Sequence, residues 1–199
     1  MTTGRMEAFS DGVLAIVITV MVLELPTPHG TTWGALHDAL PVLLSYVLSF
    51  VYIGIYWSNH HHMLQVTDRV TGLILWANLH LLFWLSLVPF TTAWLGENHF
   101  AATPAAAYGL VLLAAALAYY ALQEAIIRDQ RPTSPLAQAV GRDRKGKLSP
   151  LLYATAVGLS FVDRWLAVAV FVGVALMWLV PDRRVERTMV ARAADAADR

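Results

Sequence analysis

Apolar residues are grouped along this chain into runs separated by short polar segments. A helix needs about 20 mostly apolar residues to cross the hydrocarbon layer of a membrane. Runs of about that length predict six transmembrane helices. They cover about 6–25, 34–62, 72–95, 103–127, 148–162 and 164–181.

The last two runs are separated only by Asp163 and Arg164. A single helix over 148–181 would be too long for one crossing at about 1.5 Å per residue, and it would place this charged pair in the middle of the membrane. The pattern therefore favours a tight helical hairpin. The 34–62 run is longer than a membrane requires, so it predicts a helix that is tilted or projects beyond the bilayer.

Composition agrees with this pattern. The chain has 199 residues, of which 57% are hydrophobic and 14% charged, and its mean hydropathy is +0.54. These values are typical of an all-α integral membrane protein. The net charge is zero, which excludes strong nucleic-acid binding as the main function. There is no cysteine, so disulfides, thiolate metal sites and cysteine nucleophiles are excluded.

The positions of the basic residues predict the topology. Cytoplasmic loops of membrane proteins are enriched in lysine and arginine. With the amino terminus inside, every lysine and arginine except Arg164 falls in a cytoplasmic segment. This pattern favours six spans with both termini in the cytoplasm. We expect one transmembrane domain over 1–182, followed by a charged cytoplasmic tail over 183–199.

The first predicted helix carries a stripe of small, apolar and hydroxyl residues. Positions separated by three and four residues share one face of a helix. The stripe consists of Gly12, Ile16, Thr19 and Leu23, with Val20 beside it. It fits ordinary helix packing, and it also fits the wall of a pore formed by several copies of the chain, in which apolar rings would close the path.

A polar cluster of Arg5, Ser10 and Asp11 lies near the start of the same helix, at the membrane boundary. Ionisable groups at this boundary need partners or water. Asp11 lies within the span, so we expect a partner for it on another helix, and the histidines at 60–62 are candidates. Three consecutive histidines point in different directions on a helix and do not form a metal site together. The sequence carries no nucleophile elbow, paired carboxylates or phosphate loop, which argues against an enzyme.

The cluster Arg5-x-x-x-Phe9-Ser10-Asp11 resembles the signature of the transmembrane protein 175 family, the lysosomal potassium channels and their bacterial relatives. Further matches follow in the same order and spacing through about the first ninety residues. They are Ala39-Leu40-Pro41, Tyr46, Trp57-x-x-His60, Asn78-Leu79 and Pro89.

The resemblance implies a six-helix subunit that forms a homotetramer in the bacterial inner membrane, around a central pore lined by the first helix. It implies a potassium channel that is weakly selective over sodium, with potassium as the permeant ion and no cofactor or bound metal. By this resemblance the apolar constriction falls on Ile16, with Val20 and Leu23 further along the wall, and the layer linked to potassium preference falls on Thr19. The polar network that holds the first helix would comprise Arg5, Phe9, Ser10, Asp11, Trp57 and His60.

Two other functions compete with this interpretation. A proton-coupled secondary transporter or permease would use Asp11 and His60 as a proton relay. Transporters of that kind tend to show paired broken helices in two related halves, and this sequence shows neither feature. A membrane-embedded assembly subunit without ion flux is the third possibility. Because the sequence contains no TVGYG segment, any ion selectivity has to come from side chains on a helix.

Overall fold

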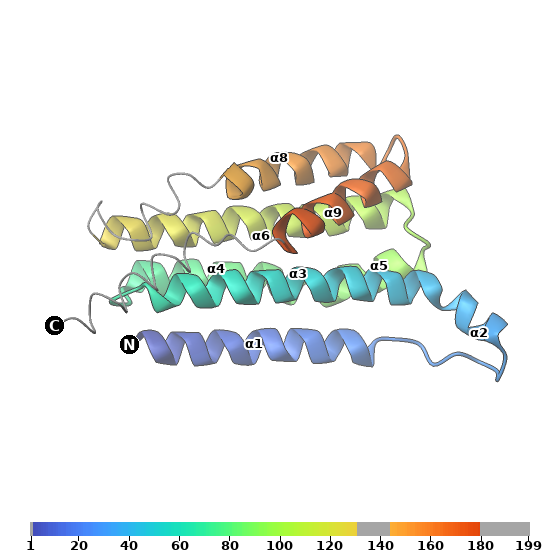
Figure 1. Ribbon diagram of the computed structural model, residues 1–199, viewed down its shortest axis with the longest axis horizontal. Helices are drawn as coiled ribbons and strands as arrows, with labels where there is room; N and C mark the ends of the chain where they lie inside the picture. Colours follow the sequence, from blue (N-terminus) through green and yellow to red (C-terminus); the bar gives the residue numbers. More distant parts are fainter. Residues whose placement is uncertain (1, 131–143, 180–199) are drawn as a thin grey trace.

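The computed structural model describes residues 2–130 and 144–179, and within them the regular structure is entirely helical. The expected tail over 183–199 lies outside the described residues, as does most of the polar loop over 129–147 that joins the fourth and fifth expected spans. The long helices lie side by side along the longest axis of the molecule, and successive ones run in opposite directions (Figure 1). The helices are α1 (Thr3–Leu23), α2 (Trp33–Asp38), α3 (Leu40–Gln65), α4 (Gly72–Ser86), α5 (Val88–Glu97), α6 (Ala102–Asp129), α8 (Arg144–Leu159) and α9 (Arg164–Leu179).

Among the described residues, four segments are long and apolar enough to cross a membrane, which makes this a multi-pass membrane protein. They are Thr3–Leu23, Leu40–Gln65, Gly72–Glu97 and Ala102–Asp129. The fifth and sixth expected spans correspond to α8 and α9, of which the structure describes 16 residues each.

Two of the expected spans are interrupted near a proline. The 34–62 span is two helices, α2 and α3, that meet at Ala39 just before Pro41. The 72–95 span is likewise divided at Leu87, before Pro89, into α4 and α5. Proline has no backbone N–H, and its ring clashes with the carbonyl of the fourth residue before it. The run over 34–62 is therefore not one continuous helix, but α3 alone, with 26 residues, is still longer than a membrane requires.

The hairpin predicted around Asp163 is present. The turn at 160–163 joins α8 to α9, and these two helices pack against each other. One carboxylate oxygen of Asp163 accepts hydrogen bonds from the backbone N–H groups of Trp165 and Leu166, at 2.7 and 3.2 Å. This side chain thus caps the start of α9. Arg164 is the first residue of α9 and lies over the Trp165 ring, 5.3 Å from its centroid, so the charged pair stands at the start of α9 and not in the middle of a helix.

The basic residues of the described segments lie mainly at one end of the bundle. The start of α1, the end of α3, the start of α4 and the end of α6 share this end, whereas the α8–α9 turn lies at the other (Figure 1). Arg69, in the connection between α3 and α4, forms an ion pair with Asp129 at the end of α6, with an N–O distance of 2.7 Å. The Arg69 guanidinium donates hydrogen bonds to the Asp129 carboxylate, and these bonds raise the pKa of Arg69.

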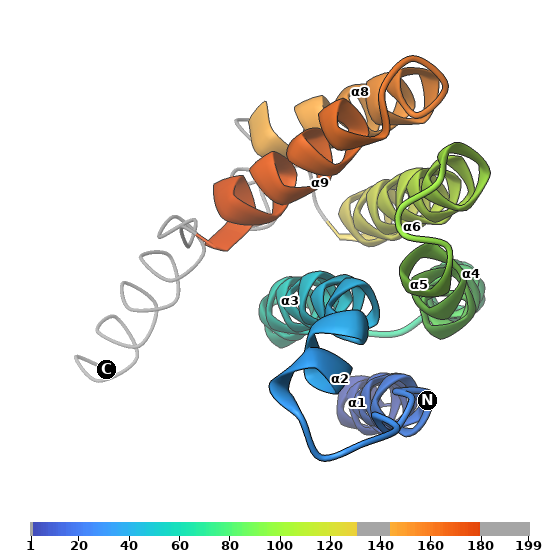
Figure 2. The same ribbon diagram turned by 90° about the vertical axis from the view of Figure 1, so that its right-hand side faces the viewer.

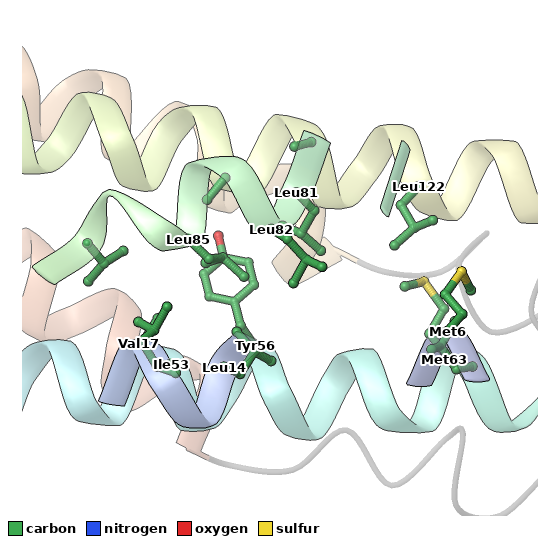
Figure 3. Close-up of a cluster of buried hydrophobic side chains, with 14 of the residues drawn as sticks. Met6, Leu14, Val17, Ile53, Tyr56, Met63, Leu81, Leu82, Leu85 and Leu122 are labelled. Atoms are coloured by element: carbon green, nitrogen blue, oxygen red, sulfur yellow. The ribbon is translucent and has the colours of Figure 1, made fainter. Parts of the chain in front are cut away.

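The apolar core is built in two parts. The inner part joins α1 to α3, α4 and α6 and contains Met6 and Met63, as well as Leu14, Val17 and Ile53 (Figure 3). The outer part joins α3, α5 and α6 to the α8–α9 hairpin around Tyr52, Tyr108 and Phe171. Two glycines allow close approach. A Cβ atom at Gly96 would lie 2.7 Å from the Val42 Cα of α3, and one at Gly109 would lie 2.9 Å from a Val157 methyl carbon of α8.

Candidate functional site

One face of α1 is packed against the subunit and the other is open. The packed face recurs every three or four residues, as expected of one side of a helix. It consists of Met6, Ser10, Leu14, Val17 and Met21, all buried. The open face carries the four residues of the predicted stripe that have side chains. Ile16 is 62% exposed, Leu23 is 81% exposed and Val20 is 36% exposed, and Thr19 is exposed beside them.

The open face is almost free of polar groups. The Thr19 hydroxyl donates a hydrogen bond to the Ile16 carbonyl oxygen of its own helix, at 2.9 Å. Its oxygen still has an acceptor lone pair that can face outward. Gly12 adds no side chain, and nothing lies within 4 Å of the place where its Cβ would be. The face can therefore offer apolar rings and one layer of hydroxyl oxygens to whatever lies beside it.

A chain of buried hydrogen bonds connects the first half of α1 to α3 and α4. Asn78 of α4 is at its centre: its amide nitrogen donates to the Ser10 hydroxyl at 3.0 Å, and its amide oxygen lies 2.7 Å from Nε2 of His60. Ser10 in turn donates to the Met6 carbonyl at 2.8 Å. Because the Asn78 oxygen only accepts, His60 carries its proton on Nε2. Nδ1 of His60 is buried and has no hydrogen-bond partner among the described residues.

A second set of contacts joins the same end of α1 to α3 nearer the surface. The Trp57 indole N–H donates to the Asp11 carboxylate at 3.0 Å. The Glu7 carboxylate lies 2.6 Å from Nδ1 of His61, and Nε2 of His61 lies 2.7 Å from the Gln65 amide nitrogen. The Trp57 and His61 rings stack with 6.2 Å between their centroids. Together these contacts form a polar brace across the α1–α3 packing.

The predicted partners of Asp11 are thus only partly those of the structure. The partner on another helix is Trp57 and not His60, which turns toward α4 instead. Asn78 lies between His60 and α1, so His60 reaches α1 only through the amide. A histidine that does contact the first helix directly is His61, through Glu7.

Two predicted members of the network, Arg5 and Phe9, do not join it within one chain. Both are exposed, Phe9 to 51%, and Arg5 makes no side-chain hydrogen bond or ion pair within the described segments. Conversely, the sequence interpretation overlooked Asn78 and Glu7 as anchor residues, whereas His61 was among the candidate histidines. Asn78 had a visible signal, because a lone amide inside the apolar run of α4 needs a buried partner.

Within residues 2–130 and 144–179, no group of three or more histidines, aspartates or glutamates is placed to hold a metal ion. The three consecutive histidines illustrate the reason. His60 points to Asn78 of α4, whereas His61 points to Glu7 of α1. The site is therefore a helix with one apolar open face and a polar anchor at one end.

Comparison with known proteins places this arrangement in context. The family model described as endosomal/lysosomal potassium channel TMEM175 matches residues 5–89. A relative named potassium channel from Chryseobacterium is 50% identical over 189 residues, covering 95% of this chain and 98% of the relative. Another from Streptomyces collinus is 39% identical and covers 84% and 86% of the two chains. The crystal structure of a lysosomal potassium-selective channel TMEM175 homolog from Chamaesiphon minutus has a TM-score of 0.76 at 32% identity, covering 89% of this chain and 96% of that one.

Proposed function

This chain belongs to the TMEM175 family, and we propose that it is a potassium channel in which four copies surround a central pore lined by α1. The observation that carries the proposal is the open face of α1. Ile16, Val20 and Leu23 are exposed on a helix whose opposite face is fully packed and anchored. Symmetric copies placed around an axis beside this face would turn each residue into a ring.

The gate of this channel is the ring formed by Ile16. Narrow apolar rings exclude water and thereby block ions, even without closing completely. Val20 and Leu23 continue the apolar wall toward the other end of α1, and Thr19 supplies the only hydroxyl layer of this stripe. Selectivity for potassium over sodium is weak in this proposal, because four flexible hydroxyls hold an ion less strictly than stacked backbone carbonyls.

The membrane layout follows the helices. The four long segments are spans, and α8 and α9 are the fifth and sixth, so that residues 1–182 form one transmembrane domain. The end of the bundle that carries Arg69 and Arg128 faces the cytoplasm, with both termini on this side, in a bacterial inner membrane.

Flux measurements on purified protein in liposomes test this proposal. We expect passive potassium flux that exceeds sodium flux. In the variant Ile16→Asn the polar amide wets the constriction, so flux should rise about tenfold or more while the preference for potassium falls. Val22→Asn is the matched control, because Val22 is also exposed on α1 but lies off the stripe. It should leave flux unchanged.

Two outcomes would overturn the proposal. Equal flux in the wild type and in Ile16→Asn would remove Ile16 from the conduction path. Potassium transport that required a proton gradient and saturated with concentration would instead identify a coupled transporter.

A further inference from the structure

A cleft opens at the end of the bundle opposite the one that carries Arg69 and Arg128. Three segments meet there: the junction of α2 and α3, the connection from α5 to α6, and the start of α9 (Figure 2). The cleft has a volume of about 370 Å³. Small-molecule sites in proteins have volumes of roughly 300–1,000 Å³, so this cleft has room for a ligand of modest size.

Arg164 supplies the positive charge of the cleft and is held in one place. One of its N–H groups donates to the His99 carbonyl oxygen at 3.2 Å, and its guanidinium lies 5.3 Å from the centroid of the Trp165 ring. The buried Phe100 supports Trp165, with 5.9 Å between the ring centroids. A guanidinium has five N–H donors, so further donors remain for a ligand.

The backbone that supplies the His99 carbonyl is unusual. His99 and Phe100 have φ angles of 49° and 59°, in the left-handed region that residues other than glycine rarely adopt. Such backbone persists only where other contacts hold it in place. Here it buries Phe100 behind Trp165 and directs the His99 carbonyl to Arg164, so the arginine is positioned before any ligand binds.

The charge of Arg164 has no carboxylate partner within the described residues. Asp163, its neighbour in sequence, caps α9 instead. Arg128 provides a contrast, because it lines a second cleft, of about 540 Å³ between α4 and α6, together with Glu124, whose carboxylate lies 3.7 Å away. The planar fork of an unpaired arginine suits the oxygens of a phosphate group. The cleft at Arg164 is therefore the better anion site of the two.

The same cleft also carries a negative charge. Asp38, the last residue of α2, has an 89% exposed side chain that lies 4.0 Å from the His37 ring and forms no ion pair with Arg164. A ligand with a phosphate and an ammonium group would satisfy both charges. A quaternary ammonium prefers open aromatic faces, but Arg164 covers the Trp165 ring. A primary ammonium suits this cleft better, because its N–H groups can donate to the Asp38 carboxylate.

The apolar walls of the cleft favour a lipid over a soluble ligand. Leu40 and Leu44 lie one turn apart at the start of α3 and are 37% and 56% exposed, so they extend from the cleft toward the middle of the bundle. Trp165 in the cleft and Trp33 on α2 are exposed at this end. Tryptophan gathers at the level of the lipid headgroups. The polar part of the cleft is thus at headgroup level, with an apolar track beneath it.

We propose that this cleft binds a phospholipid with an ethanolamine headgroup. Its phosphate lies on Arg164 and its ammonium on Asp38. One acyl chain follows Leu40 and Leu44 toward the middle of the membrane. This site is separate from the open face of α1 and does not depend on the proposed channel.

Native mass spectrometry of the full-length protein in detergent tests the headgroup. The protein is titrated with phosphatidylethanolamine, phosphatidylcholine and phosphatidylglycerol that carry the same acyl chains. We expect one saturable phosphatidylethanolamine per chain, bound about tenfold more tightly than the other two, the effect of one charge-assisted hydrogen bond. Phosphatidylcholine has no ammonium N–H and phosphatidylglycerol has no ammonium. Equal affinities for the three lipids would contradict the proposal.

Two variants separate the two charges. Arg164→Gln should weaken the binding of all three lipids about tenfold or more, whereas Asp38→Asn should lower the affinity for phosphatidylethanolamine to that for phosphatidylcholine. Arg128→Gln and Asp68→Asn are the matched controls, because they remove exposed charges outside the cleft and should bind lipid as the wild type does. All four side chains are exposed, so circular dichroism should show unchanged helicity.

Three results would overturn the site. Unchanged phosphatidylethanolamine binding in both Arg164→Gln and Asp38→Asn would remove these residues from it. An equal loss in the control variants would show attraction to surface charge in general. Finally, glycerophosphoethanolamine, the headgroup without acyl chains, should not displace the lipid at equal concentration. Displacement would identify a free phosphoester as the ligand and refute the lipid.

Discussion

Leu14 and Ile16 lie two residues apart on α1, yet Leu14 is 2% exposed and Ile16 is 62% exposed. The packed and open faces of this helix are both made largely of aliphatic side chains, so hydrophobicity does not separate them. What separates them is the set of partners on α3 and α4. The packed face has apolar contacts along its length and a buried hydrogen bond from Asn78 to Ser10, whereas the open face has none of these within the described part of the chain.

Apolar surface therefore has two different roles on the two faces of α1. On the packed face it fills space, and its loss should cost stability. On the open face it keeps water out of a path, and its loss should change conduction. Variants that affect stability and conduction separately will therefore show whether the two faces have these different roles.

The largest effect on stability is expected from Asn78→Ala. The change removes the donor to the Ser10 hydroxyl oxygen and leaves the His60 N–H without an acceptor in a buried place, at a cost of about 3 kcal/mol or more. The midpoint of unfolding by SDS in mixed micelles should fall accordingly. Asn98→Ala is the control, because Asn98 is exposed and bonds only within its own turn. Similar midpoints for both variants would show that the buried chain does not hold α1.

Leu14→Ala and Ile16→Ala form the next pair. Leu14→Ala opens a cavity in the packed core, and we expect a loss of about 2 kcal/mol in the free energy of unfolding with little change in flux. Ile16→Ala removes atoms from a side chain that is 62% exposed, so subunit stability should change by less than about 0.5 kcal/mol, while a wider ring raises flux. SDS unfolding and liposome flux on both variants check this. The reverse assignment of effects would exchange the roles of the two faces.

A smaller effect is expected from Trp57→Phe. The variant keeps an aromatic ring but removes the N–H that binds Asp11, and one such hydrogen bond to a charged, partly exposed group contributes about 1 kcal/mol. The unfolding midpoint should fall slightly and conduction should persist. Trp76→Phe serves as the control, because Trp76 is 72% exposed and its side chain makes no hydrogen bond to α1 within the described residues. A loss as large as that of Asn78→Ala would mean that Asp11, and not Asn78, is the main anchor.

Much of the fold could be predicted from the sequence because the membrane imposes simple rules. Every backbone group has to be paired inside the hydrocarbon layer, so long apolar runs become helices. The polar pair at Asp163 and Arg164 correctly marked a hairpin for the same reason. The breaks at Ala39 and Leu87 were missed, although Pro41 and Pro89 follow each of them, because hydropathy does not record the missing N–H of proline.

The partners in the anchor were less predictable. Asp11 has Trp57 as its partner, but the direction in which His60 turns depends on how α3 rotates against α4, and that rotation is set by many small packing contacts. Similarly, the stripe of Ile16, Thr19 and Leu23 could be placed on one face of the helix from spacing alone. Which of the two faces is open required the positions of the neighbouring helices.

Accessibility of single cysteines along α1 tests the central claim most directly. In a chain without native cysteine, Ile16→Cys, Thr19→Cys and Leu23→Cys should each react with a water-soluble, charged thiosulfonate, and the reaction should block potassium flux, whereas Leu14→Cys and Val17→Cys should remain unmodified. If α1 lines the pore, the reactive positions recur every three or four residues on the open face. Block from the packed positions, or no block from the open ones, would show that the conduction path lies elsewhere.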